Sequence, residues 1–96
     1  MSYELKFLPT ALKEWKKLGA TIREQFKKKL EERLLEPVVS ADRLRGQQNY
    51  YKIKLRSAGY RLVYEVDKGE ITIYVIVVGK RENDEVYKEA VKRKRT

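Results

Sequence analysis

Apolar residues follow two different periods along the chain, and these periods predict the order of its elements. Between residues 2 and 8, Tyr3, Leu5 and Phe7 alternate with polar residues. This alternation indicates a half-buried strand. Pro9 ends the strand, because proline cannot donate a backbone hydrogen bond to a sheet.

After Pro9 the apolar residues lie further apart in the sequence, at the spacing of one face of a helix. This spacing predicts two helices. Thr10 caps the first helix and Gly19 closes it. Thr21 and Glu24 form a capping box for the second helix, which runs to Pro37. The apolar positions of the two helices are Ala11, Leu12, Trp15 and Leu18, then Ile22, Phe26, Leu30 and Leu34. Trp15 and Phe26 are expected in the core.

The second half of the chain alternates again and predicts a β-meander followed by a helix. A loop over residues 38–49 comes first. The expected elements are strands at 50–56, 60–66 and 70–78, tight turns at Ala58-Gly59 and Lys68-Gly69, and a helix at about 83–93 that begins near Asn83. The order β-α-α-β-β-β-α predicts an α+β fold: a small antiparallel sheet of about four strands, an N-terminal helix pair on one face and a C-terminal helix.

The first hairpin has a register that its apolar residues restrict. Tyr51, Ile53 and Leu55 must share a face with Leu62, Tyr64 and Val66. We expect a two-residue loop, with residue 55 opposite 62 and residue 53 opposite 64. The opposite face then carries the cations Lys52, Lys54, Arg56 and Arg61, because a slip of one residue would bury lysines.

The strand at 70–78 is apolar on both sides, which is typical of an interior strand covered on both faces. We expect one side to be covered by the helix pair and the other, in part, by the last helix. That helix would bring Tyr87 toward the lysines, with Arg81 in the connection. One side of the strand at 70–78 is expected to carry Ile71, Ile73, Val75 and Val77. The other side is expected to carry Tyr74, Ile76 and Val78.

Composition limits the chain to one domain, residues 1–96, and narrows its chemistry. The chain has no histidine and no cysteine, and therefore no imidazole base, thiol nucleophile or disulfide. We expect no metal site and no cofactor. A formal charge of +9 and a pI near 9.8 favour a polyanionic partner, with nucleic acid first.

The chain shows no sign of export or membrane insertion. Its first residues, MSYELKFLPT, are charged and unlike a signal peptide. No segment approaches the roughly 20 apolar residues of a membrane helix. We therefore expect a cytoplasmic protein.

The cations on the hairpin face allow two interpretations. Like charges on neighbouring strands repel and cost stability, so the presence of four cations on one face requires an explanation. One interpretation is a solvated basic face in a basic protein. The other is a phosphate-binding site, in which Lys52, Lys54, Arg61 and Arg81 stabilise charge that develops on a phosphodiester.

Tyr87 also has two interpretations, either core packing or catalysis. Nearby cations should lower its pKa and allow it to act as a general base, or its ring could stack on an RNA base. Lys54, crowded by other cations, is the preferred proton donor, and Lys52 could share the base role. RNA suits this chemistry because its 2′-hydroxyl is an internal nucleophile.

Other cations are candidate contacts to the RNA backbone rather than catalytic groups. Arg45 is either a phosphate contact or an ordinary loop cation. Arg56 belongs to the hairpin face. Lys27 and Lys28 lie on the polar face of the second helix, which is either solvated or bound to RNA.

Four runs carry a resemblance to a known family: ALKEWKKLG, DRLRG, YYKIKLRSAGYRLVYEV and VGKRENDEVYKEAVKR. They resemble the RelE toxins of bacterial RelE/RelB toxin–antitoxin systems, in the RelE/ParE superfamily, over nearly the whole chain. Asn83 departs from the resemblance, because close relatives often carry an arginine there. The resemblance implies that the catalytic positions are Lys52, Lys54, Arg61, Arg81 and Tyr87, and that Arg45 belongs to their surroundings.

The resemblance also implies an activity and a set of partners. It implies a metal-independent, ribosome-dependent endonuclease that cuts mRNA in the ribosomal A site and stops translation. It implies a RelB-like antitoxin, with operator DNA bound only through the toxin–antitoxin complex. Two alternatives stay open: a ParE-like toxin that poisons DNA gyrase, and a noncatalytic RNA-binding protein.

Overall fold

The computed structural model of the chain describes residues 2–82 and 84–93 and confirms the predicted order of elements. No helix in these ranges is long and apolar enough to span a bilayer. The elements are β1 (Glu4–Phe7), α1 (Pro9–Lys17), α2 (Ala20–Leu35), the short 3-10 helix η1 (Ser40–Asp42), β2 (Tyr50–Leu55), β3 (Tyr60–Asp67), β4 (Thr72–Lys80) and α3 (Glu85–Lys92).

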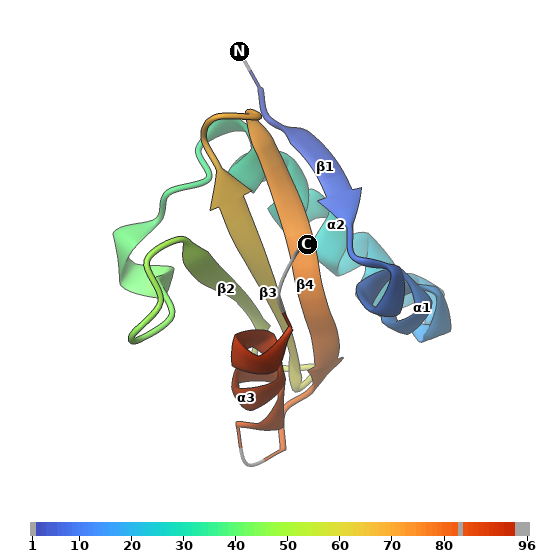
Figure 1. The fold of residues 1–96 in the computed structure, drawn as a ribbon. Coiled ribbons are helices and arrows are strands. Elements are labelled where there is room, and N and C mark those ends of the chain that lie inside the picture. The colour runs from blue at the N-terminus through green and yellow to red at the C-terminus, as the bar shows by residue number, and fades with distance from the viewer. Residues whose placement is uncertain (1, 83, 94–96) are drawn as a thin grey trace.

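The sheet has four strands in the order β1-β4-β3-β2. β2, β3 and β4 are antiparallel as expected, but β1 pairs parallel to β4, so the sheet is mixed. The long connection through α1 and α2 permits this, since parallel strands need a crossover rather than a tight turn. Figure 1 shows α3 in front of the strands and α2 behind them, with α1 beside the edge formed by β1.

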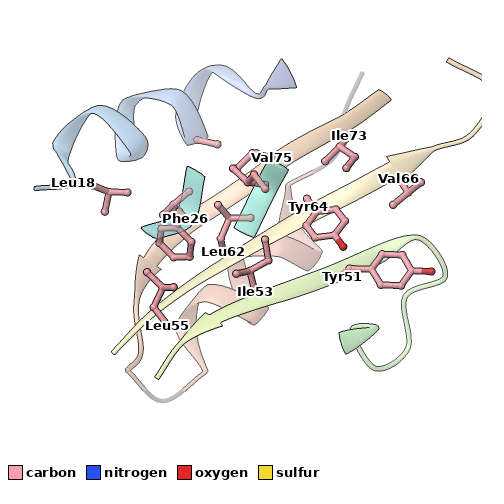
Figure 2. Close-up of a cluster of buried hydrophobic side chains, with 13 residues drawn as sticks. Leu18, Phe26, Tyr51, Ile53, Leu55, Leu62, Tyr64, Val66, Ile73 and Val75 are labelled. Carbon is pink, nitrogen blue, oxygen red and sulfur yellow. The ribbon is translucent and has the colours of Figure 1, made fainter. Parts of the chain in front are cut away.

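Two apolar clusters hold these layers together, one on each face of the sheet. Figure 2 shows the larger cluster, in which Phe26 of α2 lies against Ile53, Leu62 and Val75. The second cluster lies under α3 and joins Val63, Ile76, Val77, Val86 and Ala90. The prediction that β4 is covered on both faces is therefore confirmed.

The first hairpin keeps its predicted faces but not its predicted register. Leu55 pairs with Tyr60 and Ile53 with Leu62, two residues away from the expected partners. The connection is a four-residue turn ending at Gly59, which has φ +71 and donates its N–H to the Leu55 carbonyl at 2.8 Å. A shift of two residues preserves the side-chain alternation, so Lys52, Lys54 and Arg61 stay on one face, but β2 ends at Leu55 and Arg56 falls in the turn.

β4 begins and ends two residues later than expected and contains a β-bulge. The preceding turn is longer than predicted, with Ile71 at φ 53. Val75 pairs with Tyr64 and Val77 with Val63, which leaves Ile76 without a partner in β3. Ile76 and Val77 therefore both join the cluster under α3, and Val78 returns to the other face. The predicted sides of Val77 and Val78 were wrong, because strict alternation does not survive an extra residue.

The predicted caps at the starts of the first two helices were also wrong. α1 begins at Pro9 after Leu8, and α2 begins at Ala20 after Gly19, with no side-chain cap bond at either start. Thr10 and Thr21 thus lie inside the helices. Proline suits a first helical position, because the N–H it lacks would be unbonded there anyway. α3 begins after Asp84, and the predicted start at Asn83 lies outside the described residues.

Arg33 of α2 turns inward instead of facing solvent. Its guanidinium donates to Tyr64 Oη and to Asp42 Oδ2, each at 2.7 Å. Tyr64 Oη donates in turn to the Pro37 carbonyl at 2.7 Å, and burial raises the pKa of Tyr64. This network fixes the loop after α2 to the sheet behind the lysine-bearing strand.

Candidate functional site

A cleft of about 150 Å³ lies between α3 and the neighbouring ends of the strands. Four of the predicted catalytic residues line it: Lys54, Arg61, Arg81 and Tyr87. The fifth, Lys52, places its Nζ 5.6 Å from the centre of the Tyr87 ring, within range of a cation–π contact. The structure thus brings together residues from β2, β3, the end of β4 and α3.

The sheet holds Lys54 among other positive charges. Lys54 pairs directly with Arg61 across the two strands. The pKa of Lys54 is lowered, first by the charge of Lys52, then by burial and by the charges of Arg56 and Arg61. This agrees with the expectation that Lys54 gives up its proton more readily than an ordinary lysine.

Arg61 is the most enclosed of the cleft cations, with a relative exposure of only 7%. It donates a hydrogen bond to the Tyr60 carbonyl at 3.0 Å. Because a guanidinium keeps its proton at all ordinary pH values, Arg61 supplies a fixed positive charge rather than a proton.

Tyr87 differs from its prediction in one respect. The pKa of Tyr87 is raised, because burial outweighs the lowering effect of Arg61. The expectation of a lowered pKa was wrong, since it counted the cations but not the loss of water when α3 packs on the sheet. Its hydroxyl is buried and has no hydrogen-bond partner among the described residues.

The bulge in β4 places Gly79 on the face of the sheet that α3 covers. Gly79 pairs with Arg61 and lies under α3, where a Cβ atom would come within 3.2 Å of Val86 Cγ2. In a strand without the bulge, alternation from Val75 would place Gly79 on the opposite face. Arg81 follows, and its N–H bonds to the Gly59 carbonyl at 2.7 Å.

The family of the chain follows from comparison with known proteins. Residues 5–85 match the family described as ParE toxin of type II toxin–antitoxin system, parDE. The mRNA interferase toxin RelE of Escherichia coli K12 is 60% identical over 93 residues, which covers 97% of this chain and 98% of that protein. The chain belongs to the RelE toxins of the RelE/ParE superfamily.

Solved RelE structures have the same fold as this RelE-family chain. A double-mutant E. coli RelE in the free state has a TM-score of 0.89 at 59% identity, covering 97% of this chain and 98% of that one. RelE in the intact E. coli RelBE toxin–antitoxin complex has a TM-score of 0.82 at 56% identity, covering 85% and 100%. An archaeal RelE from Pyrococcus horikoshii, at 21% identity and a TM-score of 0.65, shares the fold.

Other predicted contacts lie at or beyond the margin of the RelE-family cleft. Arg56, in the turn after β2, is close enough to affect the pKa of Lys54. Arg45 lies in a separate surface hollow of the loop before β2. Lys27 and Lys28 are exposed on α2, which lies on the other side of the sheet from α3. These last three residues are therefore not part of the cleft.

Sequence reasoning missed other residues around the cleft. Lys80 lines it beside Arg81, and three acidic residues lie on the side of α3: Glu82, Asp84 and Glu85. The run Gly79-Lys80-Arg81 was the available signal for Lys80. Among the described residues, no acidic side chains gather as a group that could hold a metal ion.

Proposed function

We propose that this chain is the toxin of a type II toxin–antitoxin system, that it acts in the cytoplasm, and that it cuts mRNA on the ribosome. The observation that carries the proposal is the cleft in which Lys52, Lys54, Arg61 and Arg81 surround Tyr87. The 60% identity to a protein named as an mRNA interferase supports the same activity.

The proposed reaction uses the 2′-hydroxyl of the RNA as its nucleophile. The 2′-oxygen attacks the adjacent phosphorus, and the bond from phosphorus to the 5′-oxygen breaks. The products are a 2′,3′-cyclic phosphate and a 5′-hydroxyl end. The protein must align the two oxygens with the phosphorus, take a proton from the nucleophile and give one to the leaving group.

The residues of the cleft divide these tasks according to their chemistry. Lys54, whose pKa is lowered, donates a proton to the leaving 5′-oxygen. Arg61 and Arg81 bind the phosphate oxygens and stabilise their growing charge. Tyr87 takes the proton of the 2′-hydroxyl, and Lys52, above its ring, assists or shares this role. Because the pKa of Tyr87 is raised, its reactive phenolate is a minor species at neutral pH.

The cations outside the cleft hold the RNA backbone. Arg45 lies in the loop before β2 and Arg56 in the turn after it, whereas Lys27 and Lys28 are exposed on α2. In this proposal they contact the mRNA or the small-subunit ribosomal RNA of the A site. Such contacts add affinity that depends strongly on salt and little on sequence.

The proposed protein partner is a RelB-like antitoxin. The E. coli relative has been solved as an intact RelBE complex and with a RelB peptide. An antitoxin that neutralises this toxin must block the cleft and the cations on its sheet side, so acidic or apolar segments of the partner suit it. Operator DNA would be bound only through the toxin–antitoxin complex.

Cell-free translation with mapping of mRNA 5′ ends tests the proposed function. We expect cuts in phase with the codons that disappear when ribosomes are omitted. A Lys54→Ala variant should bind ribosomes but cut at least about a hundredfold more slowly, since general acid catalysis contributes about that much.

Three other results would contradict the proposal. Intact mRNA with arrested translation would indicate a noncatalytic RNA-binding protein. Gyrase-dependent DNA damage with intact mRNA would indicate a ParE-like activity. Cutting that is equally fast without ribosomes would remove the ribosome from the mechanism.

A further inference from the structure

The edge of β4 beside α1 is only partly covered by a strand. β1 pairs with Thr72–Val75 and extends no further along β4. The following residues, which include the bulge at Ile76, have no strand on that side among the described elements. Exposed backbone groups of this kind need partners, because an unpaired strand edge is costly or prone to association.

Two side chains supply these partners. Glu14 of α1 accepts a hydrogen bond from the backbone N–H of Val78 at 3.1 Å. Arg93, the residue after α3, donates to the carbonyl of Ile76 at 2.8 Å. Together they bind the β4 backbone at the bulge and two residues beyond it.

Glu14 and Arg93 also bind each other. Two guanidinium nitrogens of Arg93 meet the two carboxylate oxygens of Glu14 at 2.8 and 2.9 Å. The side chains are 14% and 29% exposed, so this ion pair is mostly sheltered from water. A two-pronged arginine–carboxylate pair is geometrically specific as well as strong. We call this pair, with its two bonds to β4, the Glu14–Arg93 clamp.

The clamp fixes the C-terminal end of the helix that carries Tyr87. α3 has only eight residues, and a helix of that length is marginal on its own. Its apolar anchors are Val86 and Ala90. On the β2 side, Tyr50 Oη donates to the Arg93 carbonyl at 3.2 Å, so the end of the helix is tied toward both margins of the sheet.

We propose that Glu14 and Arg93 are positioning residues for the cleft. They hold the end of α3 and the bulge of β4 at a fixed separation. Tyr87 lies on α3, and Arg81 follows β4. Their separation therefore sets how Tyr87 faces the cations. This role rests on the proposed function, because its catalytic consequence is the cutting of mRNA.

The catalytic test uses Glu14→Gln, with Glu89→Gln as a matched control. Glu89 contacts the same Arg93 at 3.0 Å but is more exposed, and within the described part of the chain it makes no side-chain hydrogen bond to Glu14 or to β4. In single-turnover cutting on mRNA-programmed ribosomes, we expect Glu14→Gln to lower the maximal rate about tenfold or more. The ribosome concentration at half-maximal rate should stay within about twofold, because misplaced catalytic groups affect the chemical step. Glu89→Gln should retain both values within about twofold.

A double variant distinguishes positioning from general damage. If the clamp acts through Tyr87, adding Glu14→Gln to Tyr87→Phe should slow cutting little further, because the group being positioned has already lost its hydroxyl. Rate losses that multiply in the double variant would overturn the proposal. So would a Glu14→Gln variant that cuts at the rate of the unaltered toxin.

Amide hydrogen exchange tests the clamp without ribosomes. We expect Glu14→Gln to accelerate exchange in α3 and at Val78 but not in β2 and β3, whereas Glu89→Gln should leave these amides protected. If the unaltered toxin failed to cut mRNA, the proposed function would fall, and this exchange pattern alone would decide whether the clamp holds α3. Unchanged exchange in α3 would overturn the clamp.

A second variant covers the case in which Glu14→Gln does not fold. Arg93→Lys keeps the charge but not the two-pronged geometry. It should show the same rate loss and the same local exchange in a folded protein. Failure of both variants to fold would overturn the proposal, because the pair would then be a general stability element rather than a positioning device.

Discussion

Lys54 and Tyr87 both line the cleft, but their pKa values are shifted in opposite directions. Lys54 lies among cations on a strand, and their charges lower its pKa. Tyr87 lies on a helix packed on the sheet, and burial raises its pKa despite the nearby Arg61. The first effect follows from strand spacing and was predictable from the sequence. The raised pKa of Tyr87 depends on how much water is excluded when α3 packs on the sheet, and no local sequence pattern predicts this.

The raised pKa of Tyr87 predicts a particular dependence of cutting on pH. The phenolate is a minor species below its ordinary pKa of 10.0, and the folded protein lowers its fraction further. The cutting rate should therefore rise roughly tenfold per pH unit between about pH 6 and 8, because each unit increases the reactive fraction by about that factor. Tyr87→Phe should cut about a hundredfold more slowly and lose this rise, as measured from single-turnover rates across that range.

Tyr3→Phe is the control for this pH experiment, because Tyr3 lies beside β1, outside the residues that line the cleft. It should retain both the rate and the slope. A Tyr87→Phe variant that keeps the slope would assign the base role to Lys52 instead.

At the scale of elements, the bulge of β4 and the short helix α3 act as one unit. The bulge leaves Ile76 unpaired and lets Ile76 and Val77 both contact the underside of α3. Gly79 then permits the close approach of Val86. The sequence predicted a strand covered on both faces, but alternation alone cannot reveal an extra residue. Both faces are apolar here, so either assignment of Val77 and Val78 would have buried them equally well.

The close approach at Gly79 predicts the effect of a single methyl group. In Gly79→Ala, the new Cβ would lie 3.2 Å from Val86 Cγ2, so α3 must move by a few tenths of an ångström. Since a displacement near 1 Å can cost about a hundredfold in rate, we expect cutting to slow by about threefold to tenfold. Single-turnover rates measure the effect.

Gly19→Ala adds the same methyl group where no atom lies within 4 Å, and it should keep the rate within about twofold. Equal rates for Gly79→Ala and the unaltered toxin would show that α3 can shift without affecting the cleft.

At the scale of the whole molecule, positive charge is spread over both sides of the sheet. The formal charge is +9, and the cleft holds only part of it. Composition predicted a polyanionic partner, but it could not divide the cations between the cleft, the rest of the exposed surface and the interior. Arg33 is the clearest case, because it bonds Tyr64 and Asp42 instead of facing solvent.

The exposed lysines of α2 predict how binding depends on salt. We expect Lys27→Ala with Lys28→Ala to weaken ribosome binding and to lower the slope of log affinity against log salt by about 0.7 to 0.9 for each lost phosphate contact. The cutting rate at saturating ribosomes should not change, since neither residue lies in the cleft. Binding titrations at several salt concentrations measure the slope.

The matched control for the α2 lysines removes two other exposed lysines, Lys6 and Lys68, and so makes the same change in net charge. A smaller change in slope is expected for this pair. Equal slopes for the two double variants would mean that net charge, rather than contact through α2, governs binding.

The sequence by itself determined the order of elements and the face of the hairpin on which Lys52, Lys54 and Arg61 gather. These features are local: alternation and helical spacing are written in neighbouring residues, and burying the apolar set leaves only one orientation of the hairpin. The predicted register of the hairpin was wrong by two residues, but this error left the predicted face of the cations unchanged, because side chains alternate with a period of two.

Only the tertiary structure decided the parallel pairing of β1, the bulge at Ile76, the burial of Tyr87 and the Glu14–Arg93 clamp. Each depends on contacts between segments far apart in the chain, such as α1 with the residue after α3. Their free energies come from packing and from the loss of water at those contacts, and these exist only once the layers have assembled.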